Sequence, residues 1–251
     1  MVSLIPQQRD RSLPTGTKIA TILRHFWKRQ ALETMQRLRH GIPNEAPRLD
    51  HYTQPMVEAL TPTLLPTFAR AYRGQAVAIR RQSRRKSAAS DLWAALHPRA
   101  TEFLRRMVFD FCDETNQTTQ ESLTTAFRRL RSILRVGMEE GLSMSDVASA
   151  VGEVFQDPMR AMRIARTESS RAVHGGELLA ARDSGVVSKQ KWLASSDACD
   201  ICQKLDGKEV GLDEDFAYHP RAPAAYAHVR HPPLHPNCRC TTIMIVDPEY
   251  L

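Results

Sequence analysis

Four of the five cysteines lie between residues 199 and 240, in a region with few large apolar side chains. Cys199 and Cys202 are separated by two residues, and a distant second group holds His235, Cys238 and Cys240. Two such groups can place their thiolates on one ion and complete a tetrahedron. An odd cysteine count, with Cys112 far from the rest, is not typical of a disulfide framework. We therefore expect this region to fold around a metal ion, which supplies folding free energy that a small apolar core lacks.

The five candidate ligands exceed the four positions of a tetrahedral site, so their choice stays open. Pair spacing favours His235 with Cys238, but residues i and i+2 of an extended chain face the same side. Cys240 can therefore replace His235 while Arg239 points away. Thiolate-rich sites select Zn²⁺, and we expect a structural zinc. The alternatives are a reduced metal-free knuckle, a later disulfide, and a catalytic zinc, which would need an open position and a general base.

Composition places the chain among ordinary globular proteins. Of its 251 residues, 42% are hydrophobic and 25% are charged. The longest aliphatic run, residues 243–246, is far too short to span a bilayer, so no membrane partner is expected. The first ten residues lack the apolar core of a secretory signal. We expect a protein that is made and assembled in a reducing cytoplasm.

The positive charge is concentrated in the first half of the chain. Residues 1–111 contain 19 Lys and Arg against 8 Asp and Glu, whereas residues 112–160 contain 5 against 8. The remaining 11 basic residues are balanced by 12 acidic ones. An excess of this kind favours contact with a polyanion or an acidic protein surface.

A basic amphipathic helix is predicted from Pro62 or Pro66 to about Ser87. Its apolar side chains recur at spacings of three and four, and its arginines fall on the opposite side. No acidic residue occurs between positions 59 and 90. This face is either a solvated outer surface or a contact for DNA phosphates or an acidic protein, and guanidinium groups suit bidentate phosphate contact. The candidate binding residues are Arg70, Arg73, Arg80, Arg81, Arg84, Arg85 and Lys86.

The remaining pattern predicts a mainly α protein with a small, zinc-stapled, β-rich C-terminal module, an α+β arrangement. We expect further helices near residues 18–40, 90–112, 123–141 and 158–183, the last ended by Gly185. Strands are expected near 186–193 and 241–246, with a tight turn at Asp206-Gly207. The predicted divisions are a Pro-interrupted arm (1–62), a basic helical region (63–112), a helical core (113–185) and the Cys/His module (186–251).

Three sequence blocks together resemble the phage Mu F-like minor head proteins, also called the phage head morphogenesis family. The blocks are Ile164-Ala165-Arg166-Thr167-Glu168, Lys191 through Cys202 to Gly207, and Pro232 through Cys240. The resemblance covers roughly residues 110–246. It departs from the family at His174, where an asparagine is usual.

The resemblance implies a minor virion component associated with the portal protein and located inside the head near the portal vertex. Its implied partners are the portal, packaged double-stranded DNA and, further, a major capsid or scaffold protein, with assembly in the host cytoplasm. No enzyme activity attaches to the family fold. The matching structural positions are Arg166, Thr167, Glu168, Trp192, Asp206 and Gly207.

The Arg166-Thr167-Glu168 block is expected to tie its helix to the C-terminal module. Arg and Glu at i and i+2 do not face each other on a helix, so each must find a partner elsewhere. The functional prediction is a minor head protein of a tailed phage or prophage, without catalytic residues. The alternatives are a zinc-dependent nuclease or hydrolase, and a zinc-containing nucleic-acid-binding regulator.

Overall fold

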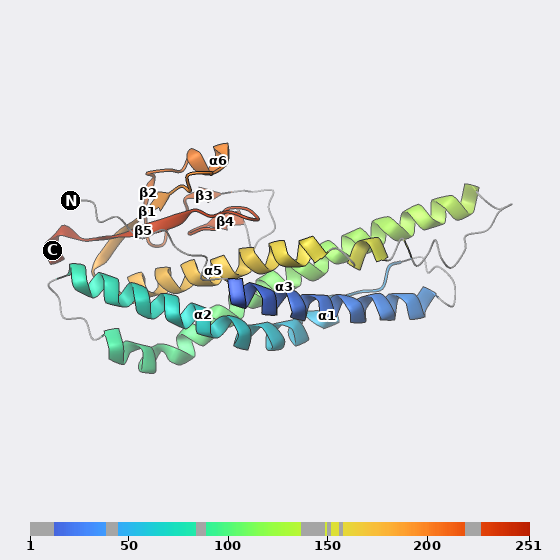
Figure 1. Cartoon of the computed structure of the whole chain (residues 1–251), viewed down its shortest axis with the longest axis horizontal. Coiled ribbons are helices and arrows are strands. Elements are labelled where there is room, and N and C mark those ends of the chain that lie inside the picture. The colour runs from blue at the N-terminus through green and yellow to red at the C-terminus, as the bar shows by residue number, and fades with distance from the viewer. Residues whose placement is uncertain are drawn as a thin grey trace.

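The computed structural model describes residues 13–38, 45–83, 89–136, 149, 152–155, 158–218 and 227–251. It confirms the expected fold class, a helical body with a small antiparallel sheet near the C-terminus. The long helices of this part of the chain are α1 (Leu13–Leu38), α2 (Thr53–Gln82), α3 (Ala89–Val136) and α5 (Pro158–Ser184), with a short 3-10 helix, η1 (Asp50–Tyr52), before α2. Figure 1 shows an elongated bundle with the sheet lying over α5.

One hydrophobic core joins all four long helices. The buried face of α1 contains Ile19, Leu23 and Trp27, at spacings that repeat the helical period. The same core continues into α2, α3 and α5, and ends near Ala172. The first helix is therefore packed into the bundle rather than extended from it.

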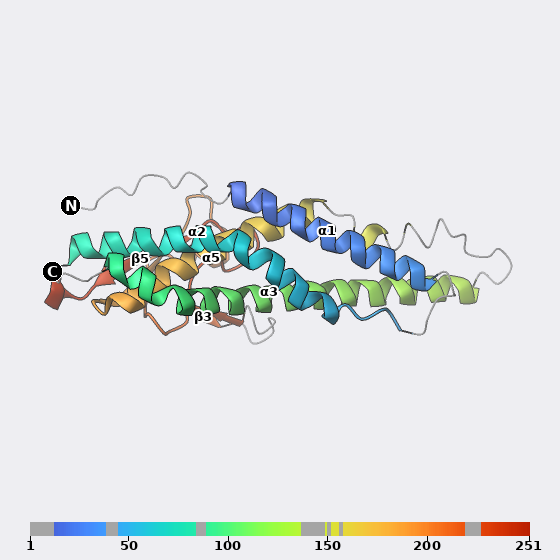
Figure 2. The same ribbon diagram turned by 90° about the horizontal axis from the view of Figure 1, so that it is seen from below.

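The prediction that α2 begins at Pro62 or Pro66 is wrong, because the helix begins at Thr53 and contains both prolines. Both prolines are exposed, so their rings face solvent. The missing N–H groups of the two prolines remove the helical donors to the carbonyls of residues 58 and 62, whereas the hydroxyl of Thr61 donates to the Val57 carbonyl at 2.7 Å. Proline is a common cause of helix kinks. Figure 2 shows that α2, which contains these two prolines, bends along its length.

The two helices expected at 90–112 and 123–141 are a single helix, α3, of 48 residues. Between the two predicted helices lie three polar residues, Thr115, Asn116 and Thr119, and all three are buried. The Asn116 amide donates to Thr53 Oγ1 at 3.0 Å and accepts from the Gln30 amide at 2.9 Å. Hydrogen bonding to α1 and α2 thus replaces apolar burial at this level of the helix.

Two adjacent glycines let α5 approach its neighbours closely. A Cβ added at Gly176 would lie 2.6 Å from the Phe68 carbonyl oxygen of α2, and one at Gly175 would lie 3.1 Å from the Met107 sulfur of α3. The helix ends before Gly185, which has φ +63, as the sequence predicted.

The C-terminal module, residues 186–251, contains a three-stranded antiparallel sheet of order β2-β1-β5. Its strands are β1 (Val187–Leu193), β2 (Glu209–Gly211) and β5 (Thr241–Val246), and a separate pair joins β3 (Ala217–Tyr218) to β4 (His228–Val229). The short helix α6 (Asp200–Gln203) follows β1, and η2 (Pro248–Tyr250) ends the chain. Val187 and Met244 pack with Ile79 of α2 and Leu178 of α5, which seats the sheet on the bundle.

Within the residues described, no helix is both long enough and apolar enough to cross a membrane.

Candidate functional site

The first half of the candidate metal site is a knuckle at the start of α6. Cys199 precedes the helix and is exposed, whereas Cys202 lies in its last turn and is buried. The Gln203 N–H donates to the Cys199 carbonyl at 2.9 Å, which closes the turn. This geometry directs both sulfurs towards the segment that precedes β5.

The second half is a turn formed by residues 235–240. The Cys238 N–H donates to the His235 carbonyl at 3.1 Å, and Asn237 takes a left-handed conformation with φ +62. Cys238 and Cys240 are buried while Arg239 is exposed and pairs with Asp197. The alternation expected for an extended chain is therefore present.

The five candidate ligands converge. His235 Nε2 lies 3.2 Å from the sulfur of Cys199 and 3.2 Å from that of Cys202, and the sulfurs of Cys202 and Cys238 are 3.8 Å apart. A tetrahedral ion with Zn–S bonds of about 2.3 Å requires sulfurs about 3.8 Å apart. Two overlapping groups, Cys199-Cys202-His235 and Cys202-Cys238-Cys240, could each hold a metal ion.

The imidazole of His235 is oriented for such a role. Its Nδ1 lies 2.9 Å from the Pro236 carbonyl oxygen, which can only accept, so Nδ1 carries the proton. Nε2 then holds the lone pair that faces the two cysteine sulfurs. A backbone carbonyl commonly accepts from the other ring nitrogen of a metal-bound histidine and fixes its tautomer in this way.

Local hydrogen bonds distribute charge among the sulfurs. A hydrogen bond from Cys240 lowers the pKa of Cys238 to about 5, and the backbone N–H of Cys202 lowers the pKa of Cys199. Burial raises the pKa of Cys202 to about 12. Each half of the site thus contributes one sulfur that favours the thiolate, the form that binds metals.

The residues around the cysteines form a small core. Trp192 is fully buried and packs edge-to-face on Phe216, with ring centroids 5.1 Å apart. The Asp206 carboxylate accepts from the Ala194 N–H at 2.8 Å, and Gly207, at φ +75, donates to the Trp192 carbonyl at 2.9 Å. Three of the four clustered cysteines belong to this core, so the module lacks a large apolar interior of its own.

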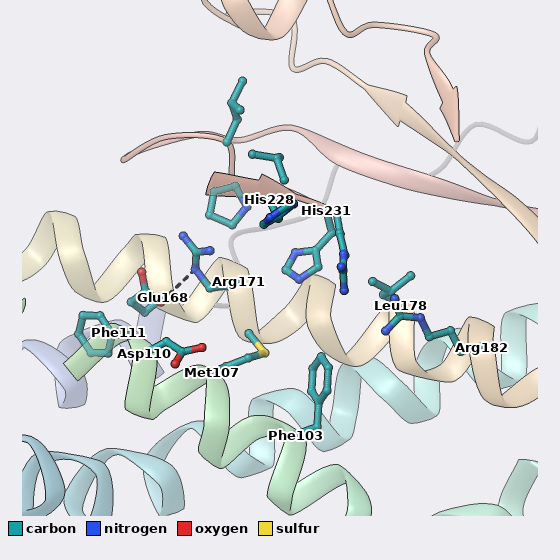
Figure 3. A pocket seen from close by; sticks show the side chains of 14 residues that line it. Phe103, Met107, Asp110, Phe111, Glu168, Arg171, Leu178, Arg182, His228 and His231 are labelled. Carbon is teal, nitrogen blue, oxygen red and sulfur yellow. Dashed lines mark hydrogen bonds and ion pairs between the residues drawn. The ribbon is translucent and has the colours of Figure 1, made fainter. Parts of the chain in front are cut away.

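The Arg166-Thr167-Glu168 block lies on α5, beneath the module. Thr167 and Glu168 are buried and Arg166 is exposed. The Thr167 hydroxyl is 3.4 Å from the backbone N–H of Asn237, which places the block against the metal-site turn. Glu168 pairs with Arg171 at 3.1 Å, one turn along the same helix (Figure 3).

The predicted basic face is partly described. Arg70, Arg73, Arg80 and Arg81 are exposed on α2, whereas Arg84, Arg85 and Lys86 lie outside the described residues. Arg70, Arg80 and Arg81 form no ion pair with any residue that the structure describes. From Arg70 to Arg81 the face extends about 16 Å along the helix.

A second basic surface was missed by the sequence reasoning. Lys18, Arg24, Lys28 and Arg29 are exposed on α1, opposite its buried face. The signal was available, because the sequence has no acidic residue between Asp10 and Glu33 and a helix was predicted there. That helix was predicted from its flanking prolines and Gly41, which say nothing about the face on which its basic residues lie.

Comparisons with known proteins agree with the resemblance. Residues 128–243 match the family described as Phage Mu protein F like protein. The chain is also 32% identical over 161 residues to a protein named NAD(+)--arginine ADP-ribosyltransferase EFV from Enterococcus faecalis (strain ATCC 700802 / V583). That match covers 60% of this chain but only 30% of the relative, so the chain spans under a third of that protein. No solved structure matches.

The family match indicates a part in phage head morphogenesis, and the family is in general structural rather than enzymatic. The matched segment begins within α3 and ends within β5, so it includes α5 and all five candidate metal ligands. Residues 128–243, a little under half of the chain, are thus similar to the phage Mu protein F-like family.

Proposed function

We propose that this chain is a minor head protein of a tailed phage or prophage, bound to the portal inside the head and in contact with packaged DNA. The match of residues 128–243 to the phage Mu F-like family carries the proposal. Two features of the fold support it: a compact Cys/His module seated on a helical bundle, and exposed arginines along α2.

The zinc module has a structural role in this proposal. Zinc bound by cysteines and a histidine in a closed tetrahedron stabilises a small fold without an open coordination position. The core around Trp192 is small, so the ion contributes to folding rather than to catalysis. Zinc analysis of the purified chain by mass spectrometry should give one ion per molecule, and a metal-free protein with a folded module would contradict this role.

Quantitative mass spectrometry of purified particles tests the virion assignment. The chain should be present in a fixed, low copy number relative to the portal protein in both procapsids and DNA-filled heads. Its absence from both kinds of particle would overturn the proposal.

DNA contact through α2 is tested by the salt dependence of duplex binding. Counterion release lowers log K by about 0.9 per phosphate contact for each unit of log salt. The double variant Arg80→Glu/Arg81→Glu should flatten that slope by about 2. The control is the double variant Arg105→Glu/Arg166→Glu, which makes the same change in net charge at exposed positions on α3 and α5. Its salt dependence of duplex binding should stay closer to that of the native chain. Equal slopes in the two double variants would contradict a specific role for α2.

A further inference from the structure

A cavity of about 310 Å³ lies where the C-terminal module meets the bundle. Its walls come from α3, from α5 and from residues 228–234, which include β4 and the segment after it. None of the five metal-ligand candidates lines it. The volume is at the lower end of the range for small-molecule pockets, which run from about 300 to 1,000 Å³.

His231 provides a hydrogen-bond acceptor in this cavity. Its Nδ1 lies 2.6 Å from the Pro232 carbonyl oxygen and must donate to it. Burial lowers the pKa of His231 to about 3, so the ring is neutral and Nε2 carries a lone pair. Nε2 has no hydrogen-bond partner among the described residues, and it remains accessible to solvent. A ligand in the cavity can therefore donate an N–H or O–H to it.

Apolar side chains face His231 from the bundle. Figure 3 shows Phe103 and Met107 of α3 pointing up towards His231, which descends from the module. Leu234 adds apolar surface from the module side. A flat ring with polar edges fits between such surfaces. Aromatic and sulfur-containing side chains contact the faces of the ring, and an imidazole forms a hydrogen bond with its edge.

Charge divides the cavity into two ends. Asp110 and Glu168 lie at one end in Figure 3, and Arg182 lies at the other. Glu168 is already neutralised by Arg171. Arg182 is held by the Leu212 carbonyl at 2.9 Å and by the exposed Asp213 at 2.8 Å, but its buried Nε has no hydrogen-bond partner among the described residues and keeps a donor for a bound anion. A bound anion would be repelled by the carboxylate end and attracted to the Arg182 end.

We propose that this cavity binds a mononucleotide. The base would lie against Phe103 and Met107 and donate an N–H to His231, and the phosphate would lie towards Arg182. The chemistry follows from an apolar floor, an unpartnered acceptor and a cationic end within one nucleotide-sized space. The inference does not depend on the virion assignment or on DNA contact by α2.

Isothermal titration calorimetry of the full chain with adenosine monophosphate tests the site. Adenosine and ribose 5-phosphate are the comparison probes, because each lacks one half of the nucleotide. Adenosine monophosphate should bind at least tenfold more tightly than either. Equal binding of adenosine monophosphate and ribose 5-phosphate, or no binding of adenosine monophosphate at millimolar concentration, would overturn the proposal.

Three variants locate the binding. His231→Phe keeps a ring but removes the acceptor and should weaken adenosine monophosphate and adenosine binding at least tenfold. Arg182→Gln should weaken binding of the nucleotide but not of adenosine, and Arg182→Lys should restore part of the loss. Arg105→Gln, an exposed position on α3, serves as the control and should change neither. Circular dichroism checks that each variant is folded, and unchanged nucleotide affinity in folded His231→Phe would refute the site.

Discussion

The backbone N–H of Asn237 faces the hydroxyl of Thr167, with 3.4 Å between nitrogen and oxygen. The same hydroxyl donates to the Arg163 carbonyl at 2.8 Å, so one buried threonine serves both α5 and the turn that holds Cys238. The helical bundle and the metal-site turn are therefore joined directly, in addition to the apolar contacts of the sheet.

Replacing Thr167 with valine should weaken the contact between α5 and the turn that contains Cys238. The shape is nearly unchanged, but the Asn237 N–H loses its acceptor, at an expected cost of about 1 kcal/mol. Amide hydrogen exchange should rise at Asn237 and in the adjacent turn. Thr167→Ser keeps the hydroxyl and should exchange at nearly the native rate there. Exchange in Thr167→Val identical to native would show that the hydrogen bond contributes nothing.

Zinc retention should distinguish the four ligands from the spare cysteine. The contacts of His235 Nε2 with two sulfurs favour the set Cys199, Cys202, His235 and Cys238. We expect Cys240→Ala to keep one zinc per chain and His235→Ala to bind the metal less tightly, since Cys240 would then have to take the fourth position. Competition with a chromogenic chelator measures both. The reverse order would assign the fourth position to Cys240.

The two glycines of α5 should respond differently to alanine. At Gly176 the new Cβ would meet a backbone oxygen at 2.6 Å, which cannot move without shifting α2, so a loss of about 1–3 kcal/mol is expected. At Gly175 it would meet the Met107 sulfur at 3.1 Å, which belongs to a flexible side chain. There the higher helix propensity of alanine, worth up to about 1 kcal/mol, offsets the contact. Chemical denaturation measures both values, and equal losses at the two positions would contradict the packing described.

Glu114 should make stability depend on pH. Burial and the nearby charge of Glu168 raise the pKa of Glu114 in the folded state above its ordinary value. The folded chain therefore keeps this proton to higher pH than the unfolded chain does. Its favourable contribution is complete below the unfolded pKa of about 4.3 and is lost as pH rises through the folded pKa.

Glu114→Gln imitates the protonated side chain at every pH. Its melting temperature should exceed that of the native chain at pH 7 and should match it near pH 4. Glu102→Gln, an exposed position on the same helix, provides the control and should show no such crossover. A native chain that is the more stable of the two at pH 7 would contradict the expected direction.

The clustering of the candidate metal ligands was largely predictable because its information is local. The spacing of Cys199 to Cys202 and the alternation around Arg239 both appear in the structure as the sequence indicated. The preference for His235 over Cys240 that we propose could not be predicted, because it rests on the Pro236 carbonyl that orients the imidazole. That contact is set by the path of the turn, which no residue spacing specifies.

The helix boundaries were less predictable because tertiary contacts decide them. A stretch of threonines and an asparagine indicates a loop when only apolar periodicity is considered. In the structure Asn116 lies between Gln30 and Thr53, and α3 continues through this level. The cavity at His231 was invisible for the same reason, since its walls come from three segments that are distant in the sequence.

The length of α3 gives the molecule a mechanical property. From Pro98 to Val136 the helix is about 57 Å long, and Figure 1 shows its far end reaching past the end of α1. Because Leu123 and Phe127 of α3 belong to the same core as α1, α2 and α5, the bundle holds the helix along most of this length. The helix therefore acts as a rigid strut that keeps the two ends of the elongated bundle at a fixed distance from each other.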